Sequence, residues 1–273
     1  MTNLQKRALS GVMFVAVTVA CILFSSTTYC LLFATITALL LNEFNTLLHD
    51  HHLAEVNNTI SVVSGVYLFV AFYLYSSGQA GEAIFGPYVL SLMLLCVGEL
   101  YFKKETPFAN WVYAFAGHVW LALPMALMNV LAFNVVYSPL LPLAVFVLLW
   151  LNDSGAYLVG SALSKRIPYK LFPSVSPKKS WAGSVGGAVV VIIGAAVFSR
   201  FSEEGGLLFW IGLGVVVCVA GTWGDLVESQ FKRQLGIKDS GRFLPGHGGV
   251  LDRFDSALLA IPAVAVYMSF FAW

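Results

Sequence analysis

Long apolar runs, separated by short polar segments, dominate the chain. In windows of about 20 residues, the length that a helix needs to cross a bilayer, several such runs stand out. They cover residues 8–25, 28–48, 58–76, 84–101, 108–134, 139–160, 181–199, 206–230 and 251–271. Lipid offers no partner for backbone polar groups, and the runs are too long and continuous for barrel strands, so each is expected to be a helix. The pattern predicts an all-α polytopic membrane protein with about nine transmembrane helices.

Two of the runs need a closer look. Pro124 stands inside 108–134 and would kink that span or turn it back as a re-entrant segment. The first run follows Lys6 and Arg7, as the apolar part of a signal peptide does. No small-x-small cleavage site follows it, so we interpret it as an uncleaved first span.

Composition and charge placement agree with a membrane protein. The chain is 59% hydrophobic and 11% charged, whereas a soluble domain carries about 25% charged residues. With nine spans and the N-terminus in the cytoplasm, all of the 15 basic residues except Arg200 fall at the inner surface. This asymmetry follows the positive-inside rule. It predicts a cytoplasmic N-terminus and a C-terminus on the other side.

The two halves of the chain differ in charge. Residues 1–150 carry few charged residues, whereas 151–256 carry most of the others, on two long inner loops and the adjacent helix ends. No convincing repeat relates the halves. We expect a single membrane domain, 1–273, in which 1–150 is mainly a helical scaffold and 151–273 is the catalytic half.

Carboxylates are placed in pairs on two predicted helices. Asp225, Glu228, Ser229 and Lys232 stand at i, i+3, i+4 and i+7 and share one helix face, and Asp252 and Asp255 are three apart at the start of the last span. Carboxylates near membrane depth are costly unless they are paired, hydrated or bound to a cation. Oxygen ligands of this kind suit Mg²⁺, which adds waters and substrate phosphates to one or two carboxylates.

Basic residues exceed what these acids need. They are Lys178, Lys179, Lys232, Arg233, Lys238, Arg242 and Arg253. A divalent metal together with excess Lys and Arg indicates a polyanionic ligand, as in phosphoryl and nucleotidyl transfer. The segment "PGHGG" just before the last span would let the backbone approach a ligand closely near a helix N-terminus.

Structural interpretations of these residues stay open. The basic loops could serve positive-inside topology and attraction to anionic lipid. Asp225 and Glu228 could form an ion pair with Lys232, and His247 could be a turn residue. Glu43 and Glu99 lie near the inner ends of their spans and are interpreted as packing or interface residues.

The segment "SQFKRQLGIKDSGRFLPGHGGVLDRFD" resembles the signature of the phosphatidate cytidylyltransferase family, also called CDP-diacylglycerol synthases. The matching positions are Ser229, Lys232, Arg233, Lys238, Asp239, Gly241, Pro245, His247, Gly248, Gly249, Asp252, Arg253 and Asp255. "DSGAYLVG" from Asp153 and "SPKKSWAG" from Ser176 are similar to family segments in the same order. The resemblance covers about the C-terminal 120 residues. Ala182 stands where the family usually has glutamate, so any role of that glutamate is missing or supplied elsewhere.

The resemblance implies the reaction of CTP with phosphatidic acid to give CDP-diacylglycerol and pyrophosphate. With the charge pattern, it leads us to expect Mg²⁺ bound by Asp225 and Asp252; whether a second cation joins it stays open. The residues expected to be catalytic are Asp225, Lys232, Arg233, Lys238, Asp239, His247, Asp252, Arg253 and Asp255. The residues expected to bind substrate are Asp153, Ser176, Lys178, Lys179, Glu228, Ser229, Gly248 and Gly249.

The expected setting is a bacterial inner membrane, with the active site facing the cytoplasm. The expected partners are CTP, phosphatidic acid and the bilayer, with no nucleic acid, and the resemblance suggests a homodimer. A transporter of phosphorylated solutes is the first alternative, but it should show repeat symmetry and broken helices at the midplane. A CTP-dependent lipid kinase, such as a polyprenyl-alcohol kinase, is the second, and its product would tell the two enzymes apart.

Overall fold

The structure is a computed structural model that describes residues 3–101, 104–134, 136–164, 166–202, 205–241 and 248–271, with side chains from residue 9 onward. Contacts within the chain divide it into two compact units. The first unit comprises residues 1–139 and 239–253, and the second comprises 140–238 and 254–273. One membrane domain with a scaffold half and a catalytic half stays a prediction.

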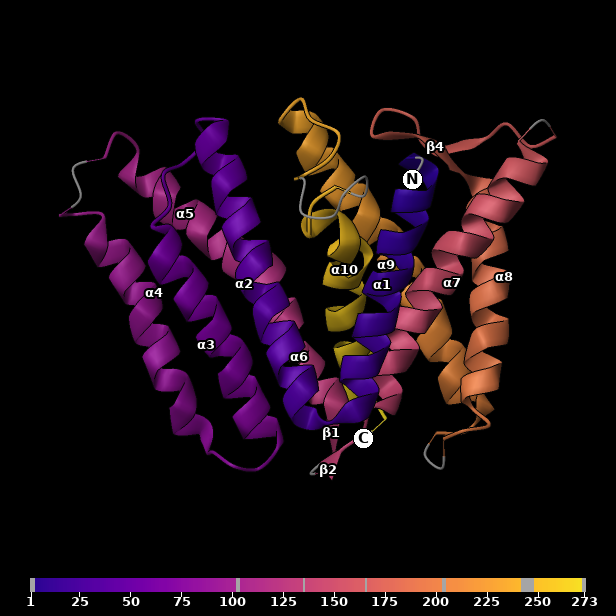
Figure 1. Ribbon diagram of the computed structural model, residues 1–273, viewed down its shortest axis with the longest axis horizontal. Helices are drawn as coiled ribbons and strands as arrows, with labels where there is room; N and C mark the ends of the chain where they lie inside the picture. Colours follow the sequence, from indigo (N-terminus) through magenta and orange to yellow (C-terminus); the bar gives the residue numbers. More distant parts are fainter. Residues whose placement is uncertain are drawn as a thin grey trace. The chain divides into compact units, whose positions relative to one another are not determined.

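The first unit is a helical bundle in which α2, α3 and α4 run side by side (Figure 1). Its elements are α1 (Asn3–Phe24), α2 (Ser26–Asp50), α3 (Asn58–Ser76), the 3₁₀ helix η1 (Glu82–Phe85), α4 (Gly86–Gly98), α5 (Pro107–Gly117), the π-helical turn η2 (His118–Ala122), α6 (Leu123–Ala132) and the strands β1 (Phe133–Asn134) and β2 (Val136–Tyr137). Local signals start the helices. Ser25 and Thr28 form a capping box at α2, and the Asn57 side chain caps α3.

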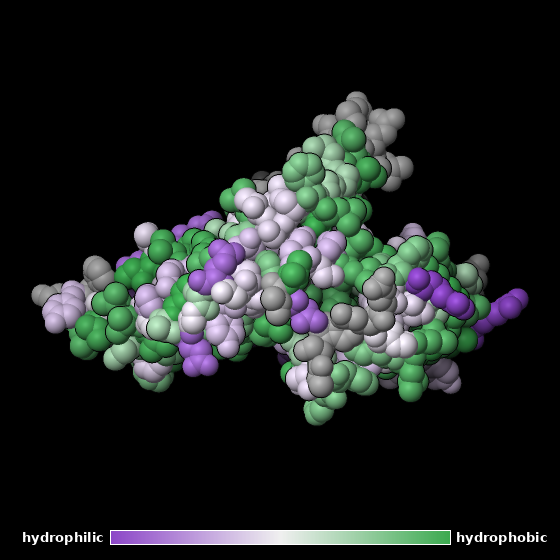
Figure 2. All heavy atoms as spheres, turned by 90° about the horizontal axis from the view of Figure 1, so that it is seen from below, coloured by the Kyte–Doolittle hydropathy of each residue, from purple (hydrophilic) through white to green (hydrophobic). Residues whose placement is uncertain are grey.

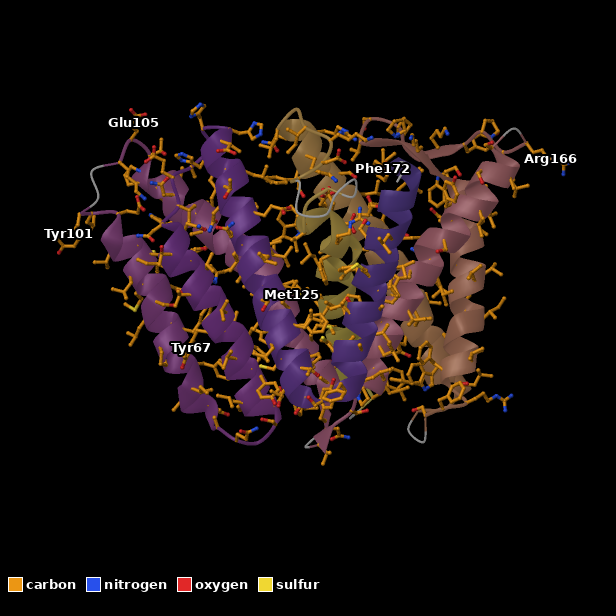
Figure 3. The ribbon with its side chains drawn as sticks, in the orientation of Figure 1. Tyr67, Tyr101, Glu105, Met125, Arg166 and Phe172 are labelled. Atoms are coloured by element: carbon orange, nitrogen blue, oxygen red, sulfur yellow. The ribbon has the colours of Figure 1, made fainter. Side chains whose placement is uncertain are left out.

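The fifth apolar run is a continuous helix. The α5, η2 and α6 segments follow one another from Pro107 to Ala132, and this stretch is long and apolar enough to cross a membrane. The π-helical turn ends two residues before Pro124, whose ring removes one backbone donor. Met125, labelled in Figure 3, is fully buried in the first unit. The helix therefore accommodates the proline without turning back.

The second unit combines long helices with a small hairpin at one end of them (Figure 1). Its elements are α7 (Leu140–Leu163), β3 (Lys170–Phe172), β4 (Ser176–Ser180), α8 (Trp181–Phe198), α9 (Leu207–Gln234) and α10 (Leu251–Ser269), whose first three residues belong to the first unit. The antiparallel β3–β4 pair and the short β1–β2 pair were not expected from the hydropathy pattern. The Ser180 hydroxyl accepts a hydrogen bond from the Gly183 amide and so caps α8 directly after the hairpin.

Glycines let α7 and α8 pack with their backbones close together. A Cβ atom on Gly187 would lie 2.6 Å from Asn152 Oδ1 and 2.8 Å from the Asn152 carbonyl oxygen. On Gly183 it would lie 2.8 Å from the Ala156 carbonyl oxygen. Small residues serve this purpose generally where membrane helices meet.

The described helices fit a membrane setting. Six of them are long and apolar enough to cross a bilayer, and 9–24 and 82–98 are shorter apolar helices. Each apolar run of the sequence is helical, which confirms the all-α polytopic fold, although α4 ends earlier than expected. Val185, Val189, Ile193 and Val197 form an exposed apolar stripe on α8. Hydrophobic residues cover much of the face drawn in Figure 2. That all nine runs cross the membrane stays a prediction.

Gly187→Ala should lower the melting temperature of the purified protein, because the new Cβ meets α7 atoms that include backbone. Overpacking of this kind costs about 1–3 kcal/mol, although alanine favours helix more than glycine does. Gly86→Ala is the matched control, since Gly86 has helical dihedrals and nothing lies within 4 Å of its Cβ position. Equal melting temperatures for the two variants would contradict the close packing.

Candidate active site

A pocket of about 470 Å³ opens in the second unit between the end of α7, the β3–β4 hairpin, the start of α8 and the middle of α9. Acidic, basic and neutral polar side chains line it together. The charged and polar ones are Asn152, Asp153, Ser161, Ser164, Lys170, Lys178, Lys179, Ser180, Ser184, Thr222 and Asp225. A pocket with both signs of charge suits a ligand that carries anionic groups alongside a cation.

Lys179 and Asp225 form the closest ion pair at this pocket. Lys179 Nζ lies 2.6 Å from Asp225 Oδ2, and about a quarter of each side chain is exposed. Ser229 Oγ donates to Asp225 Oδ1 at 3.2 Å, and Lys179 Nζ donates to the Thr222 carbonyl oxygen at 3.4 Å. The pair therefore ties β4 to α9, and both partners remain accessible from the pocket.

Asp255 of the second unit interacts with two other carboxylates of that unit. Asp255 on α10 is repelled by Asp225 and Asp153 and attracted by Lys232. Glycine makes the approach of α9 to α10 possible, because a Cβ on Gly224 would lie 2.7 Å from the Asp255 carbonyl oxygen. The Asp255 carboxylate accepts one hydrogen bond, from the Ser256 amide at 2.6 Å.

These residues fit a divalent cation that binds with few protein ligands. Within the described residues, no three His, Cys, Asp or Glu side chains come together as a complete metal site. These carboxylates nevertheless supply oxygen donors, which suit a hard divalent cation. Mg²⁺ is commonly bound through one or two carboxylates, with waters and substrate phosphates completing the coordination. Of these carboxylates, Asp153 and Asp225 line the pocket.

The α9 helix also carries a buried ion pair. Lys232 Nζ lies 2.6 Å from Glu228 Oε2, and the Glu228 side chain is fully buried. Glu228 was expected to bind substrate, and the structure instead pairs it with Lys232; substrate binding by Glu228 stays a prediction. Breaking a buried pair by removing one partner leaves an uncompensated charge, so Glu228 holds Lys232 in place.

Two other predicted residues, Arg233 and Ser176, lie at the hairpin. Arg233 donates from Nη1 to the Ile237 carbonyl oxygen at 2.8 Å and from Nε to the Val175 carbonyl oxygen at 3.4 Å. Ser176 pairs with Phe172 at one end of the hairpin. Phe172, labelled in Figure 3, packs edge-on against Trp223 with ring centroids 5.5 Å apart. Lys238 and Asp239 are exposed.

In the first unit, Asp252 holds the segment before α10. Its Oδ2 accepts hydrogen bonds from the Ser240 amide at 2.9 Å, the Ser240 hydroxyl at 3.0 Å and the Gly249 amide at 2.7 Å. Gly248 has φ +82°, and a Cβ there would lie 2.2 Å from Asp252 Oδ2, so only glycine fits. The Arg253 amide donates to the Val250 carbonyl oxygen. Arg242, Pro245 and His247 lie outside the described residues.

The sequence brought together some site residues and missed others. Asp153, Lys178, Lys179 and Asp225 line one pocket, and their roles at a site stay predictions. Lys170 and Thr222 line it as well and had not been singled out. Glu43, which was interpreted as a packing residue, accepts hydrogen bonds from the segment before α10. That Asp225 and Asp252 bind one metal ion stays a prediction, since they belong to different units.

A model of the cytidylyltransferase family matches residues 5–271. The chain belongs to the cytidylyltransferase family. It is 44% identical over 133 residues to a phosphatidate cytidylyltransferase of Haemophilus influenzae, a match that covers 47% of this chain and 45% of the relative. Similar matches reach the proteins of the same name from Staphylococcus aureus, at 44% over 128 residues, and Staphylococcus haemolyticus, at 42% over 125 residues. Each covers 45% of this chain and 46% of the relative, so the chain spans about half the length of the curated relatives it matches.

Membership of the cytidylyltransferase family fits the chemistry of the pocket. Transfer of a nucleotidyl group joins polyanions, and a divalent cation is typical of such enzymes. One cavity contains positive groups that suit phosphates and carboxylate oxygens that suit a cation. The positive groups are the lysines on β3 and β4, and the carboxylates are the acids on α7 and α9.

Adding Mg²⁺ or Mn²⁺ should raise the melting temperature of this cytidylyltransferase-family protein, because a ligand that binds only the folded state stabilises it by mass action. Asp225→Asn should remove most of the increase, which thermal unfolding in detergent would measure. Asp50→Asn, at the exposed end of α2, is the charge-matched control and should keep it. A full increase in Asp225→Asn and in Asp255→Asn would show that the cation binds elsewhere.

Proposed function

We propose that the protein transfers the cytidylyl group of CTP to phosphatidic acid and releases pyrophosphate, giving CDP-diacylglycerol for phospholipid synthesis. The observation that carries the proposal is the pocket, where Lys170, Lys178 and Lys179 gather with Asp153 and Asp225. It belongs to a chain of the cytidylyltransferase family, and the relatives named above are phosphatidate cytidylyltransferases.

The reaction joins two anions. A phosphate oxygen of phosphatidic acid attacks the α-phosphorus of CTP, the bond from that phosphorus to the bridging oxygen breaks, and its electron pair leaves with pyrophosphate. The attacking phosphate is already ionised near neutral pH, so no strong general base is required. The protein must mainly align the two phosphates and offset their repulsion.

The residues of the second unit divide these tasks. Lys178 and Lys179 hold the phosphates of CTP, with Lys170 at the same pocket, and Asp225 and Asp153 provide carboxylate oxygens. Lys232 and Arg233 stabilise the charge of the leaving group. Mg²⁺ held by Asp225 and Asp252 would supply charge neutralisation and polarise a phosphoryl oxygen. Lys238, Asp239, His247, Arg253 and the glycines 248 and 249 complete the proposed site.

The membrane provides the second substrate. Apolar helices keep the protein in the bilayer, where phosphatidic acid resides, and CTP is a cytoplasmic solute. We therefore propose that the protein lies in a bacterial inner membrane with the pocket facing the cytoplasm. That it forms a homodimer is proposed from the family resemblance alone.

The test is an assay with the purified protein, CTP labelled in the cytosine ring or the α-phosphate, and phosphatidic acid in mixed micelles. We expect a labelled lipid and pyrophosphate. Labelled CDP with a phosphorylated lipid alcohol as acceptor product would identify a CTP-dependent lipid kinase instead.

Asp225→Asn and Asp252→Asn should abolish turnover while the protein still folds. Asparagine keeps one side-chain oxygen, which can still accept the hydrogen bonds from Ser240 and Gly249 at residue 252, while the charge is lost and the other oxygen becomes an NH2 group. Activity above about a tenth of the wild-type rate at saturating Mg²⁺ corresponds to a barrier increase under about 1.4 kcal/mol. Such a small effect in either variant would contradict its assignment as a metal ligand.

Single cysteines in a cysteine-free background should report the topology of the second unit. Ser174 and Gln234 are exposed residues of the hairpin and of the end of α9, and Gly206 is exposed before α9. In intact cells, a membrane-impermeant thiol reagent should label Gly206→Cys and leave Ser174→Cys and Gln234→Cys unlabelled until the cells are opened. Labelling of Ser174→Cys or Gln234→Cys from outside would refute a cytoplasmic pocket.

A further inference from the structure

Glu43 reaches from α2 to the segment that precedes α10, about two hundred positions later in the chain. Its Oε1 accepts from the Ser240 hydroxyl at 2.5 Å and from the Leu251 amide at 3.0 Å, and its Oε2 accepts from the Val250 amide at 2.7 Å. All of these residues belong to the first unit. The carboxylate thus satisfies two backbone donors that begin α10, where negative charge is favourable.

Two glycines leave the space that the Glu43 carboxylate fills. A Cβ on Gly249 would lie 2.1 Å from Glu43 Oε1, and one on Gly241 would lie 3.0 Å from Oε2. The Gly241 Cβ position is also 3.2 Å from the Gly249 Cα atom. The two stretches that flank residues 242–247 therefore meet at this carboxylate.

Ser240 connects Glu43 to Asp252. Its hydroxyl lies 2.5 Å from Glu43 Oε1 and 3.0 Å from Asp252 Oδ2, and a hydroxyl has one hydrogen to donate. The two carboxylates divide the backbone donors between them. Asp252 accepts from the Ser240 and Gly249 amides, whereas Glu43 accepts from those of Val250 and Leu251. Moving either carboxylate would disturb the other through the shared hydroxyl.

Capping alone does not require a residue from a distant helix. Helix N-termini are usually capped by a residue just before the helix. Asp252 already accepts the Gly249 amide, which adjoins the amides that Glu43 accepts. Glu43 adds a second carboxylate from α2, and the glycines at 241 and 249 accommodate it. This arrangement fixes the position of the segment relative to α2, in addition to satisfying its donors.

We propose that Glu43 is a positioning residue for Asp252, one of the proposed metal ligands. It fixes the backbone of Ser240, Gly241 and Gly249–Leu251 and, through Ser240, the orientation of the Asp252 carboxylate. The catalytic consequence rests on the proposed function, whereas the ordering of the segment does not.

Glu43→Gln is the central variant, because it keeps the size of the side chain but replaces one acceptor oxygen with a donor group. It should lower kcat for CDP-diacylglycerol formation at least tenfold, about 1.4 kcal/mol in the barrier, because the Asp252 carboxylate loses its fixed orientation. The KM for CTP should change less than about threefold, because the CTP phosphates are assigned to lysines of the other unit. Glu82→Gln, an exposed acid in η1, is the matched control and should leave both constants unchanged.

Amide hydrogen exchange supplies a measurement that does not need activity. In Glu43→Gln, peptides that cover 248–253 should exchange faster, while peptides from the middle of α2 and α3 should match the wild type. If the wild type lacks cytidylyltransferase activity, the proposed function fails and the exchange pattern still decides the role of Glu43. Wild-type exchange at 248–253 would overturn the proposal, and so would faster exchange throughout the first unit, which indicates a purely structural role.

Ser240→Ala tests the link with a smaller change in case Glu43→Gln does not fold. It removes the shared hydroxyl and leaves both carboxylates and their backbone donors. We expect a lower kcat and a higher Mg²⁺ concentration for half-maximal activity, with a melting temperature close to that of the wild type. In the Glu43→Gln background, Ser240→Ala should lower kcat by a much smaller factor than in the wild type, because both substitutions break the same hydrogen-bond network. Independent, multiplicative effects of the two substitutions would overturn the link.

Discussion

A carboxylate beside apolar helices needs a compensating group, because its charge is costly near lipid. Three acids of the structure meet this constraint through partners of the fold. Asp225 pairs with Lys179, Glu228 pairs with Lys232, and Glu43 accepts backbone amides at the start of α10. Lys179 belongs to the hairpin, Lys232 to the end of α9, and the amides to the start of α10. The interactions that compensate the charges therefore also hold these three elements in position.

Glycine determines how closely the supporting elements approach. At Gly187 and Gly224 a side chain would meet backbone of α7 and α10, and at Gly249 it would meet the Glu43 carboxylate. The absence of a side chain therefore serves two ends. Within the second unit it allows helices to pack closely enough for Asp225 and Asp255 to interact, and in the first unit it leaves space for a charged group.

The sequence predicts the helices well, because lipid leaves an apolar run of this length no other way to satisfy its backbone. The charge pattern and the family resemblance also placed Asp153, Lys178, Lys179 and Asp225 among the expected site residues, and all four line one pocket. The sequence could not predict Glu43, because a lone acid near the end of a span does not reveal which distant amides it meets. The β3–β4 hairpin was missed because its strands, of three and five residues, are too short and too mixed in polarity to give a hydropathy signal.

In the proposed function, the ion pair between Lys179 and Asp225 also couples binding of the nucleotide phosphates to binding of the cation. Lys179 Nζ and Asp225 Oδ2 are 2.6 Å apart. Lys179 therefore occupies a position where a cation would contact Asp225, and Asp225 occupies a position where a phosphate would contact Lys179. A phosphate that binds Lys179 weakens its hold on Asp225, and a cation that binds Asp225 releases Lys179 for phosphate. Coupling of this kind is reciprocal, so either ligand raises the affinity for the other. In the proposed function, the ion pair would therefore favour joint binding of a nucleotide and its metal ion over binding of either alone.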